Sequence, residues 1–221
     1  MVREKLELGA GIYTITSISD ILKIKKNKIS HIFNYYYNYK LEDSSNHKYL
    51  LDIEGHKAVN FLSLVEIKIF FTLHEHGIKY PTTFKAHEFL SKELKTPYPF
   101  AHHEILISGS DILFELDSKD LIKADESKQT AIKGIVLPFC KKIEYNSKNI
   151  AKSYYPLGKE KSIIIDPEHQ FGEPTIKNTN ILVQSVAEMY NAGDSKELIS
   201  NIYNLNYETI NDAISYYNQS A

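Results

Sequence analysis

The segment 162–217 changes its hydrophobic period partway along, and this change restricts the folds that it can adopt. Residues 163–165 form a β-branched run that stops at the turn initiator Asp166-Pro167, and Thr175-Ile176 favours a second short strand. Beyond Ile181, apolar residues recur every three or four positions, as on the buried face of a helix. They predict three helices with these inward residues: Val183, Val186, Ala187 and Tyr190; Leu198, Ile199, Ile202 and Tyr203; and Ile210, Ala213, Ile214 and Tyr217.

Turn and capping residues separate these three helices. Gly193 ends the first helix, and Asp194-Ser195 begins the second, with Glu197 three residues after Asp194 as in a capping box. Asn206 is the expected N-cap of the third helix. A strand pair followed by three helices joined by tight turns has the outline of a helix-turn-helix module.

Several motifs in this segment are similar to those of a known family. They are I-D-P at 165–167, F-G-x-P at 171–174, I-x-x-T-x-I at 176–181, A-G-D-S at 192–195 and the Tyr203-x-Leu205 turn. The segment resembles the small bacterial domain called domain of unknown function number 433. Members of that family are associated with toxin–antitoxin operons and are thought to be antitoxin pieces. Asn180 departs from the pattern, because the family usually has Arg at this place.

Charge is distributed unevenly along the chain. Residues 1–40 contain seven basic and three acidic side chains, a net charge of +4, whereas residues 162–221 contain two basic and eight acidic side chains, a net charge of −6. A polyanion such as DNA is attracted to the first region and repelled by the second. The C-terminal module therefore has the outline of a DNA-binding fold but the charge of a protein-binding one.

The spacing of apolar residues and lysines in the N-terminal region predicts a pair of basic helices. Thr16 or Ser17 is expected to cap a helix that begins near Ile18 and has Ile18, Ile21 and Leu22 on its apolar face. A second helix after the turn at 25–27 directs Ile29, Ile32 and Phe33 inward. Short polar and basic side chains on the exposed face can bond base edges and phosphates in a major groove. A solvated helix pair on a Lys-rich surface is the alternative. The candidate DNA-binding residues are Ser17, Lys25, Lys26, Asn27, Lys28, Ser30, His31 and Asn34.

The string ITSISDILKIKKNKISHIFNYY at 15–36 is similar to the amino-terminal units of MerR-like and excisionase-like proteins. The alternating tyrosines at 35–39 are expected on one face of a strand or wing beside Lys40, where the rings could stack on bases or pack against the body. Residues 47–51 predict the other strand of this wing, before a turn at 54–56.

Two further helices and a hairpin are expected next. The first helix begins at Phe61 and ends at His76-Gly77, and the second begins at Tyr80-Pro81. Gly109-Ser110 connects residues 104–108 and 111–115 through a turn that suits type II′. The phrase FLSLVEIKIFFTLHEHGIKYPTTFKAHEFL resembles the second helix pair of MerR-like regulators. It resembles more closely the amino-terminal domain of VapB-type antitoxins that carry the 433 module.

These patterns predict a mainly α protein with small β elements, of the α+β class. A MerR-like winged helix-turn-helix domain with a β-hairpin is expected at 1–115, and a three-helix, helix-turn-helix-like domain at 162–221. The segment 116–161 is expected to connect them or to pair two protomers. Its apolar run at 134–139 favours neither helix nor strand, and residues 154–158 are expected to form the linker.

Residue types that perform catalysis or bind metals have unfavourable spacing here. Cys140 is the single cysteine, which excludes an internal disulfide and a multi-cysteine zinc site, and its apolar neighbours predict burial. His74 and His76 lie two apart on a helix and do not face each other, and no H-E-x-x-H or P-loop occurs. We expect no catalytic residue, metal, cofactor or enzyme activity. The lack of a long apolar run or a signal-peptide start predicts a cytoplasmic protein without a membrane partner.

The resemblance implies an antitoxin of a type II toxin–antitoxin pair. Such a protein binds operator DNA as a homodimer, represses its own operon and neutralises a toxin by direct binding, here a PIN-like ribonuclease. One alternative is a MerR-like transcription regulator that responds to a small molecule, for which 16 Tyr and 10 Phe offer an aromatic pocket. In another alternative the C-terminal helices contact DNA and the N-terminal part dimerises.

Overall fold

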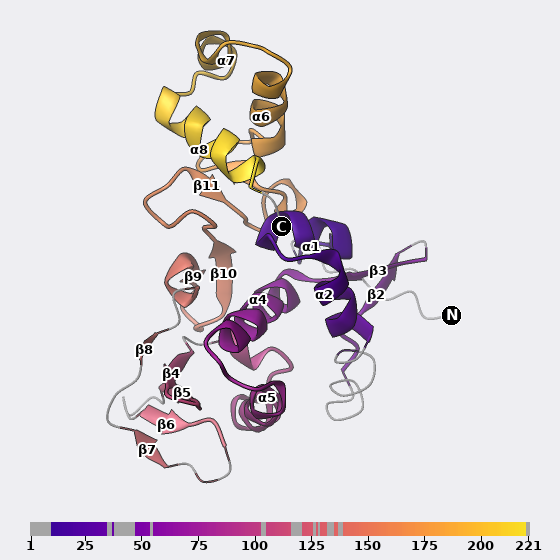
Figure 1. Cartoon of the computed structure of the whole chain (residues 1–221), viewed down its shortest axis with the longest axis vertical. Helices are drawn as coiled ribbons and strands as arrows, with labels where there is room; N and C mark the ends of the chain where they lie inside the picture. The colour runs from indigo at the N-terminus through magenta and orange to yellow at the C-terminus, as the bar shows by residue number, and fades with distance from the viewer. Residues whose placement is uncertain are drawn as a thin grey trace.

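The computed structural model describes residues 10–34, 37, 47–53, 55–102, 105–115, 121–125, 127, 129–131, 135–136 and 139–219. Within these ranges the protein is a mixed α+β structure of helices and small antiparallel sheets. Three C-terminal helices lie at one end of the molecule and a five-stranded sheet at the other, with the helix α4 (Phe61–Glu75) between them (Figure 1). No helix in these ranges is both long and apolar enough to cross a membrane.

The N-terminal elements follow the order strand, helix, helix, hairpin. They are β1 (Tyr13–Thr14), α1 (Ile15–Leu22), α2 (Lys26–His31), β2 (Leu51–Ile53) and β3 (His56–Val59), and the sheet has the order β1-β3-β2. Helix α1 begins earlier than the sequence predicts, because the hydroxyl of Thr14 caps it by accepting the N–H of Ser17 at 3.3 Å. The predicted inward residues of both helices are confirmed as buried: Ile18, Ile21, Leu22, Ile29, Ile32 and Phe33.

At the one tyrosine of the run 35–39 that the structure describes, the chain is helical and not a strand or wing. Its ring packs against the body, which is one of the two expected alternatives. Tyr37 is buried in a helical turn after α2, and its ring stacks on Tyr49 with a centroid separation of 5.0 Å. Burying this large ring against the body is the better solution, since an aromatic face contributes most when it leaves water. The remaining tyrosines of 35–39, and Lys40, lie outside the described residues. The hairpin strand β2 begins only at Leu51, not at residue 47.

The two central helices are confirmed where the sequence places them. Asn60 caps α4 by accepting the N–H of Ser63 at 2.9 Å, and the helix ends before Gly77. Helix α5 (Tyr80–Leu94) has Pro81 in its first turn. Proline is tolerated there because backbone N–H groups of the first turn have no acceptor within the helix. The 3₁₀ turn η2 (Pro99–Ala101) then packs against both helices and leads to the hairpin.

A five-stranded antiparallel sheet follows, with the order β7-β6-β5-β4-β8. In the predicted hairpin Ser108 pairs with Asp111 across Gly109-Ser110, and only Gly109 of these two has a positive φ, as in a type II′ turn. The sheet joins strands from the expected N-terminal domain at 1–115 with strands from the expected connecting segment at 116–161. The strands are β4 (Leu106–Ser108), β5 (Asp111–Glu115), β6 (Leu121–Lys123), β7 (Thr130–Ala131) and β8 (Ile135–Val136).

The expected linker at 154–158 is instead partly built into the core. Strand β9 (Ile143–Tyr145) follows the 3₁₀ turn η3 (Cys140–Lys142) and pairs with β10 (Ala151–Tyr154). Tyr154 and Tyr155 are both buried, because Tyr154 exchanges backbone hydrogen bonds with Ile165. The burial of Cys140 is confirmed, with its thiol 3.9 Å from the carbonyl oxygen of Ile105.

The C-terminal module has the predicted strand pair and three helices. Ile199, Ile210 and Ala213 lie at its centre, together with Val183 and Val186, and form a hydrophobic core separate from that of the rest of the chain. The elements are β11 (Ile163–Ile164), the 3₁₀ turn η4 (Gln170–Gly172), β12 (Thr175–Ile176), α6 (Val183–Asn191), α7 (Lys196–Tyr203) and α8 (Tyr207–Tyr217).

Several details of this module differ from the prediction. Ser195 alone caps α7, by accepting the N–H of Leu198 at 3.1 Å, so Glu197 lies in the second helical position and no capping box forms. Ile199 is the buried residue of α7, whereas Leu198 and Ile202 are 44% and 56% exposed. Successive residues of a helix point about 100° apart, so Leu198 and Ile199 cannot both face the core. The apolar stripe of α7 is wider than its contact with the core, and only the edge that contains Ile199 is buried.

Helices α6 and α8 also each have one predicted inward residue that is exposed. On α8 Tyr216 is buried at 3% exposure, while Tyr217, which the pattern predicts to face inward, is 36% exposed. On α6 the last predicted inward residue, Tyr190, is also exposed. The N-cap of α8 is confirmed as Asn206, which accepts the N–H of Thr209 at 2.8 Å.

Candidate nucleic-acid interface

The turn between α1 and α2 forms a continuous basic surface. Lys23 ends α1 in the left-handed conformation, with a φ of 56°, and Lys25 is the N-cap of α2. Ile24 lies buried between them and holds the turn against the core. The side chains that follow it are consequently all exposed: Lys25, Lys26, Asn27 and Lys28.

Most of the sequence-predicted DNA-binding residues share this surface. His31 and Asn34 are exposed on the same helical segment, and Ser30 is half-buried. Ser17 is elsewhere, on α1, where its hydroxyl donates to the carbonyl oxygen of Thr14 at 3.1 Å. The structure thus groups seven of the eight residues on α2 and the turns at its two ends, and separates Ser17 from them. The name basic surface is used below for Lys25, Lys26, Asn27, Lys28, His31 and Asn34.

The β2–β3 hairpin adds a residue that sequence reasoning missed. Lys57 on β3 is exposed, and its amine donates to the side-chain oxygen of Asn34 at 3.5 Å, which places the hairpin beside the end of the basic surface. The turn residue Gly55 is the signal that could have found it, because residues beside a hairpin turn lie at the surface. His56 and Lys57 next to the turn are exposed, while Ala58 and Val59 further along β3 are buried.

Lys23 does not belong to the basic surface, although it is part of the same basic run in the sequence. Its amine lies 4.8 Å from the centre of the Tyr216 ring, on the side of α1 that faces the C-terminal module. Partial burial lowers the pKa of Lys23 below its ordinary value. We therefore assign Lys23 to the contact between the two parts of the molecule.

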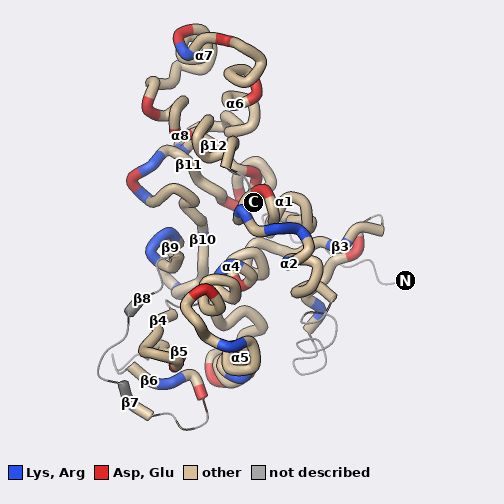
Figure 2. Tube along the Cα trace, in the orientation of Figure 1, with Lys and Arg blue, Asp and Glu red and all other residues tan. Residues whose placement is uncertain are grey.

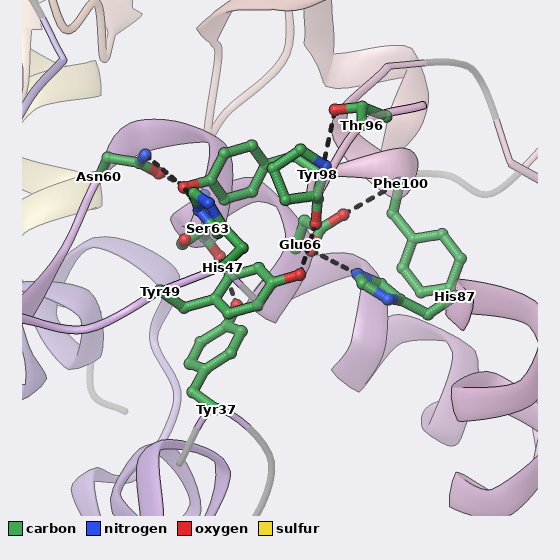
Figure 3. Close-up of polar contacts among 11 residues, drawn as sticks. Tyr37, His47, Tyr49, Asn60, Ser63, Glu66, His87, Thr96, Tyr98 and Phe100 are labelled. Carbon is green, nitrogen blue, oxygen red and sulfur yellow. Dashed lines mark hydrogen bonds and ion pairs between the residues drawn. The ribbon is translucent and has the colours of Figure 1, made fainter. Parts of the chain in front are cut away.

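A buried carboxylate supports the helices behind the basic surface (Figure 3). Glu66 on α4 accepts the backbone N–H of Phe100 at 2.9 Å through one oxygen, and its other oxygen lies 2.9 Å from His87 Nε2 on α5. Both side chains are 3% exposed. This pair joins α4, α5 and the turn η2 inside the core, since a buried carboxylate is stable only when its oxygens are bonded.

Tyrosines extend this polar cluster toward the N-terminal elements. The Tyr98 hydroxyl accepts a hydrogen bond from the Asn60 amide at 2.8 Å and lies 2.9 Å from His47 Nε2. The hydroxyl of Tyr49 donates to the carbonyl oxygen of Pro97 at 2.9 Å, and Tyr49 also carries the stacked ring of Tyr37. The turn that follows α2 is thereby tied to the central helices, which fixes the orientation of α2.

Two tyrosine hydroxyls join the C-terminal module to the N-terminal elements. Tyr13 on β1 donates to the carbonyl oxygen of Gly172 at 3.2 Å, and Tyr216 on α8 donates to that of Ile21 on α1, also at 3.2 Å. Burial raises the pKa of both phenols, so each remains protonated and able to donate. Figure 1 shows the end of α8 beside α1, as these bonds require.

A cleft of about 580 Å³ opens beside these two contacts. Burial, with a further contribution from the nearby Asp20 carboxylate, raises the pKa of Glu173 in its wall. The cleft has the size of a small-molecule site and a mixed polar and aromatic lining. Its main lining residues come from α1 and the C-terminal module: Thr16, Asp20, Lys23, Glu173, Gln184 and Tyr217.

The turn between α1 and α2 and the three C-terminal helices differ in charge, although basic positions also occur elsewhere, as beside β9 and β11 (Figure 2). Basic positions gather where α1 meets α2, while acidic positions are spread over the three C-terminal helices. Residues 183–217 contain one lysine and five acidic side chains. Within the described ranges, no group of three or more His, Cys, Asp or Glu side chains is arranged to hold a metal ion.

Comparison with known proteins gives a family match for the C-terminal module and a fold match for most of the chain. The family described as "Protein of unknown function (DUF433)" matches residues 163–217, which cover the strand pair and helices of the C-terminal module. The crystal structure of Rv2018 from Mycobacterium tuberculosis is similar over 91% of this chain and 96% of that chain, with a TM-score of 0.64 and 15% sequence identity. At this identity the likeness shows a shared fold. No curated protein matches the sequence.

Proposed function

We propose that this protein is an antitoxin of a type II toxin–antitoxin pair. It binds operator DNA through the basic surface and the β2–β3 hairpin, and it holds a PIN-like ribonuclease through its acidic C-terminal module. The observation that carries the proposal is the exposed run Lys25–Lys28 on α2, at a distance from a helical module with five acids and one lysine. The family that matches residues 163–217 is described as one of unknown function. The antitoxin assignment is supported by the sequence resemblance of this segment to a family whose members are associated with toxin–antitoxin operons.

The order of elements supports α2 as the recognition helix. A helix whose exposed face carries Lys, Asn and His can bond phosphates and base edges, and a neighbouring hairpin with Lys57 can contact the adjacent backbone. A homodimer would place two such helices on palindromic half-sites about one helical turn, roughly 34–36 Å, apart. In this proposal the protein breaks no covalent bond in the DNA, and it acts by binding the operator and repressing transcription.

A gel shift with the intergenic DNA upstream of the gene tests the DNA contact. We expect the variant Lys26→Glu/Lys28→Glu to lose this binding at moderate salt. The slope of log K against log salt should fall by about 0.9 for each lost phosphate contact. The matched control is Lys85→Glu/Lys92→Glu on α5, which makes the same change in net charge on exposed lysines away from α2. Equal binding by both double variants would contradict the assignment.

Co-purification with the product of the adjacent gene tests the antitoxin role. We expect a stable complex in which the ribonuclease activity of the partner is inhibited, while the Lys26→Glu/Lys28→Glu variant still forms it. A partner that remains fully active in the presence of excess chain contradicts the role.

The cleft between α1 and the C-terminal module favours a second candidate function, a transcription regulator that responds to a small molecule. A ligand bound there would contact both parts of the molecule and alter the position of α1. This function predicts that a small ligand raises the melting temperature without any protein partner. A library of small molecules that leaves the melting temperature unchanged would speak against it.

A further inference from the structure

Helix α7 carries an apolar row that the fold does not use. Leu198 and Ile202 lie four positions apart, so they neighbour each other on the helix surface, and they are 44% and 56% exposed. Glu197 and Asn201, also four apart and exposed, form the adjoining row. These four residues are called the α7 face below.

The exposure of this row follows from how α7 is held in the module. Ile199 is buried at the centre of the core, and Tyr203, one turn further, packs partly against it. Two serine hydroxyls hold the ends of α7. The hydroxyl of Ser195 accepts the N–H of Leu198 at the first turn, and the hydroxyl of Ser200 donates to the carbonyl oxygen of Leu205 at 2.6 Å beyond the last turn. Of the four residues of the α7 face, Leu198 takes part in these contacts, and only through its backbone N–H. The side chains of Leu198 and Ile202 therefore stay exposed without any rearrangement.

Charge beside the row indicates the kind of partner. Glu197 is exposed next to Leu198, and the three helices together hold five acids against Lys196. That lysine lies near the ring of Tyr190, 5.4 Å from its centre, which directs it toward α6. A basic surface with an apolar hollow complements this arrangement, whereas a second copy would bring two acidic modules together.

We propose that the α7 face is the docking surface for the ribonuclease partner of the proposed function, on which this inference rests. Leu198 and Ile202 enter an apolar hollow on the partner, and Glu197 pairs with a basic side chain at its rim. Apolar anchors at the centre of an interface contribute most of the affinity, and rim charges mainly set the association rate and its salt dependence.

The position of α7 allows both partners to bind together. Figure 1 shows α7 at the end of the molecule, with α8 between it and α1. The bonds that join the module to the N-terminal elements come from Tyr216 on α8 and Gly172 before β12, not from α7. Docking on α7 therefore leaves the basic surface open to DNA.

The test measures the affinity of the adjacent gene's product for single variants of the full chain. Leu198→Ser and Ile202→Ser should each weaken the complex by about tenfold or more, and Glu197→Lys should slow association and reduce its salt dependence. Ile12→Ser is the matched control, because Ile12 is another exposed isoleucine, at 41%, and precedes β1 instead of lying on α7. Melting temperature and operator binding should be the same in all variants.

The outcomes separate this inference from the proposed function. If the wild-type chain binds the partner and Ile202→Ser and Leu198→Ser bind equally well, the docking surface is elsewhere and the antitoxin role stands. If the wild-type chain does not bind the partner, the antitoxin role itself fails. Loss of self-association in the two serine variants, measured by light scattering, would assign the α7 face to a second copy and overturn the inference.

Discussion

Tyr13 and Tyr216 fix the C-terminal module against α1 through one hydroxyl each. A buried neutral hydrogen bond contributes about 0.5–1.5 kcal/mol to the free energy of unfolding, and a buried carbonyl oxygen that loses its donor costs additional desolvation energy. We therefore expect Tyr13→Phe and Tyr216→Phe each to lower the free energy of unfolding by about 1–2 kcal/mol, as measured by urea denaturation. An unchanged free energy of unfolding in both variants would show that the hydroxyls are not needed at this contact.

Gly172 gives a sharper test of the same contact. It has a φ of +85°, and a methyl group there would overlap the hydroxyl of Tyr13. Gly172→Ala should destabilise the protein more than Tyr13→Phe does, because it introduces both backbone strain and a clash. The double variant should lose less free energy of unfolding than the sum of the single variants, since removing the hydroxyl relieves part of the overlap. Additive losses would contradict the contact.

Glu173, whose side chain is only partly shielded from solvent, is expected to give stability a small pH dependence. Burial and the Asp20 carboxylate raise its pKa in the folded state, so the folded protein binds a proton more readily than the unfolded chain. The resulting stabilisation is present below the unfolded pKa and is lost as the pH rises through the folded pKa. We expect Glu173→Gln to raise the melting temperature at pH 7 and to flatten its pH dependence above pH 4.5, the ordinary value for this carboxyl. A lower melting temperature at pH 7 would contradict this.

At the scale of elements, the β2–β3 hairpin extends the basic surface through Lys57. Lys57→Ala should weaken operator binding by a few-fold, about the loss of one phosphate contact, and should lower the salt slope by about 0.9. Lys92→Ala is a suitable control, because Lys92 is an exposed lysine paired with Glu88 on α5. Fluorescence anisotropy with labelled operator DNA distinguishes the two variants. Equal affinities would place the hairpin outside the interface.

The helices were largely predictable from the sequence, and the reasons for the exceptions are local. Apolar periodicity and the cap Asn206 placed α8 correctly, and Gly77 placed the end of α4, because such signals act within one turn. Helix α1 begins earlier than expected because three hydroxyl residues, Thr14, Thr16 and Ser17, can each cap a helix, and in the structure Thr14 does so. On α7 the period alone could not decide which edge of a wide stripe, Ile199 or Leu198, would meet the core.

The candidate interface was predictable only in part. The run Lys25–Lys28 was evident from charge and spacing, but its separation from Lys23 was not, because that depends on Tyr216, far along the chain. The short strands β6, β7 and β8 are also set by long-range pairing, and two- or three-residue strands carry too little periodicity to be recognised. The sequence also left open whether Tyr37 packs or faces solvent, since its stacking partner Tyr49 lies on a later segment of the chain.

At the scale of the whole molecule, the basic surface and the α7 face belong to different hydrophobic cores joined by a tyrosine contact. Two separate surfaces permit two partners at once, so a complex of operator DNA, this chain and the ribonuclease should form. The charges of the two surfaces also make their salt dependence differ, because only the DNA contact releases condensed counterions.

A supershift assay tests this division of roles most directly. Operator DNA shifted by the wild-type chain should shift further when the ribonuclease is added. The Lys26→Glu/Lys28→Glu variant should fail to shift DNA while still binding the ribonuclease. The account is contradicted if that variant shifts DNA normally, or if it loses both partners together.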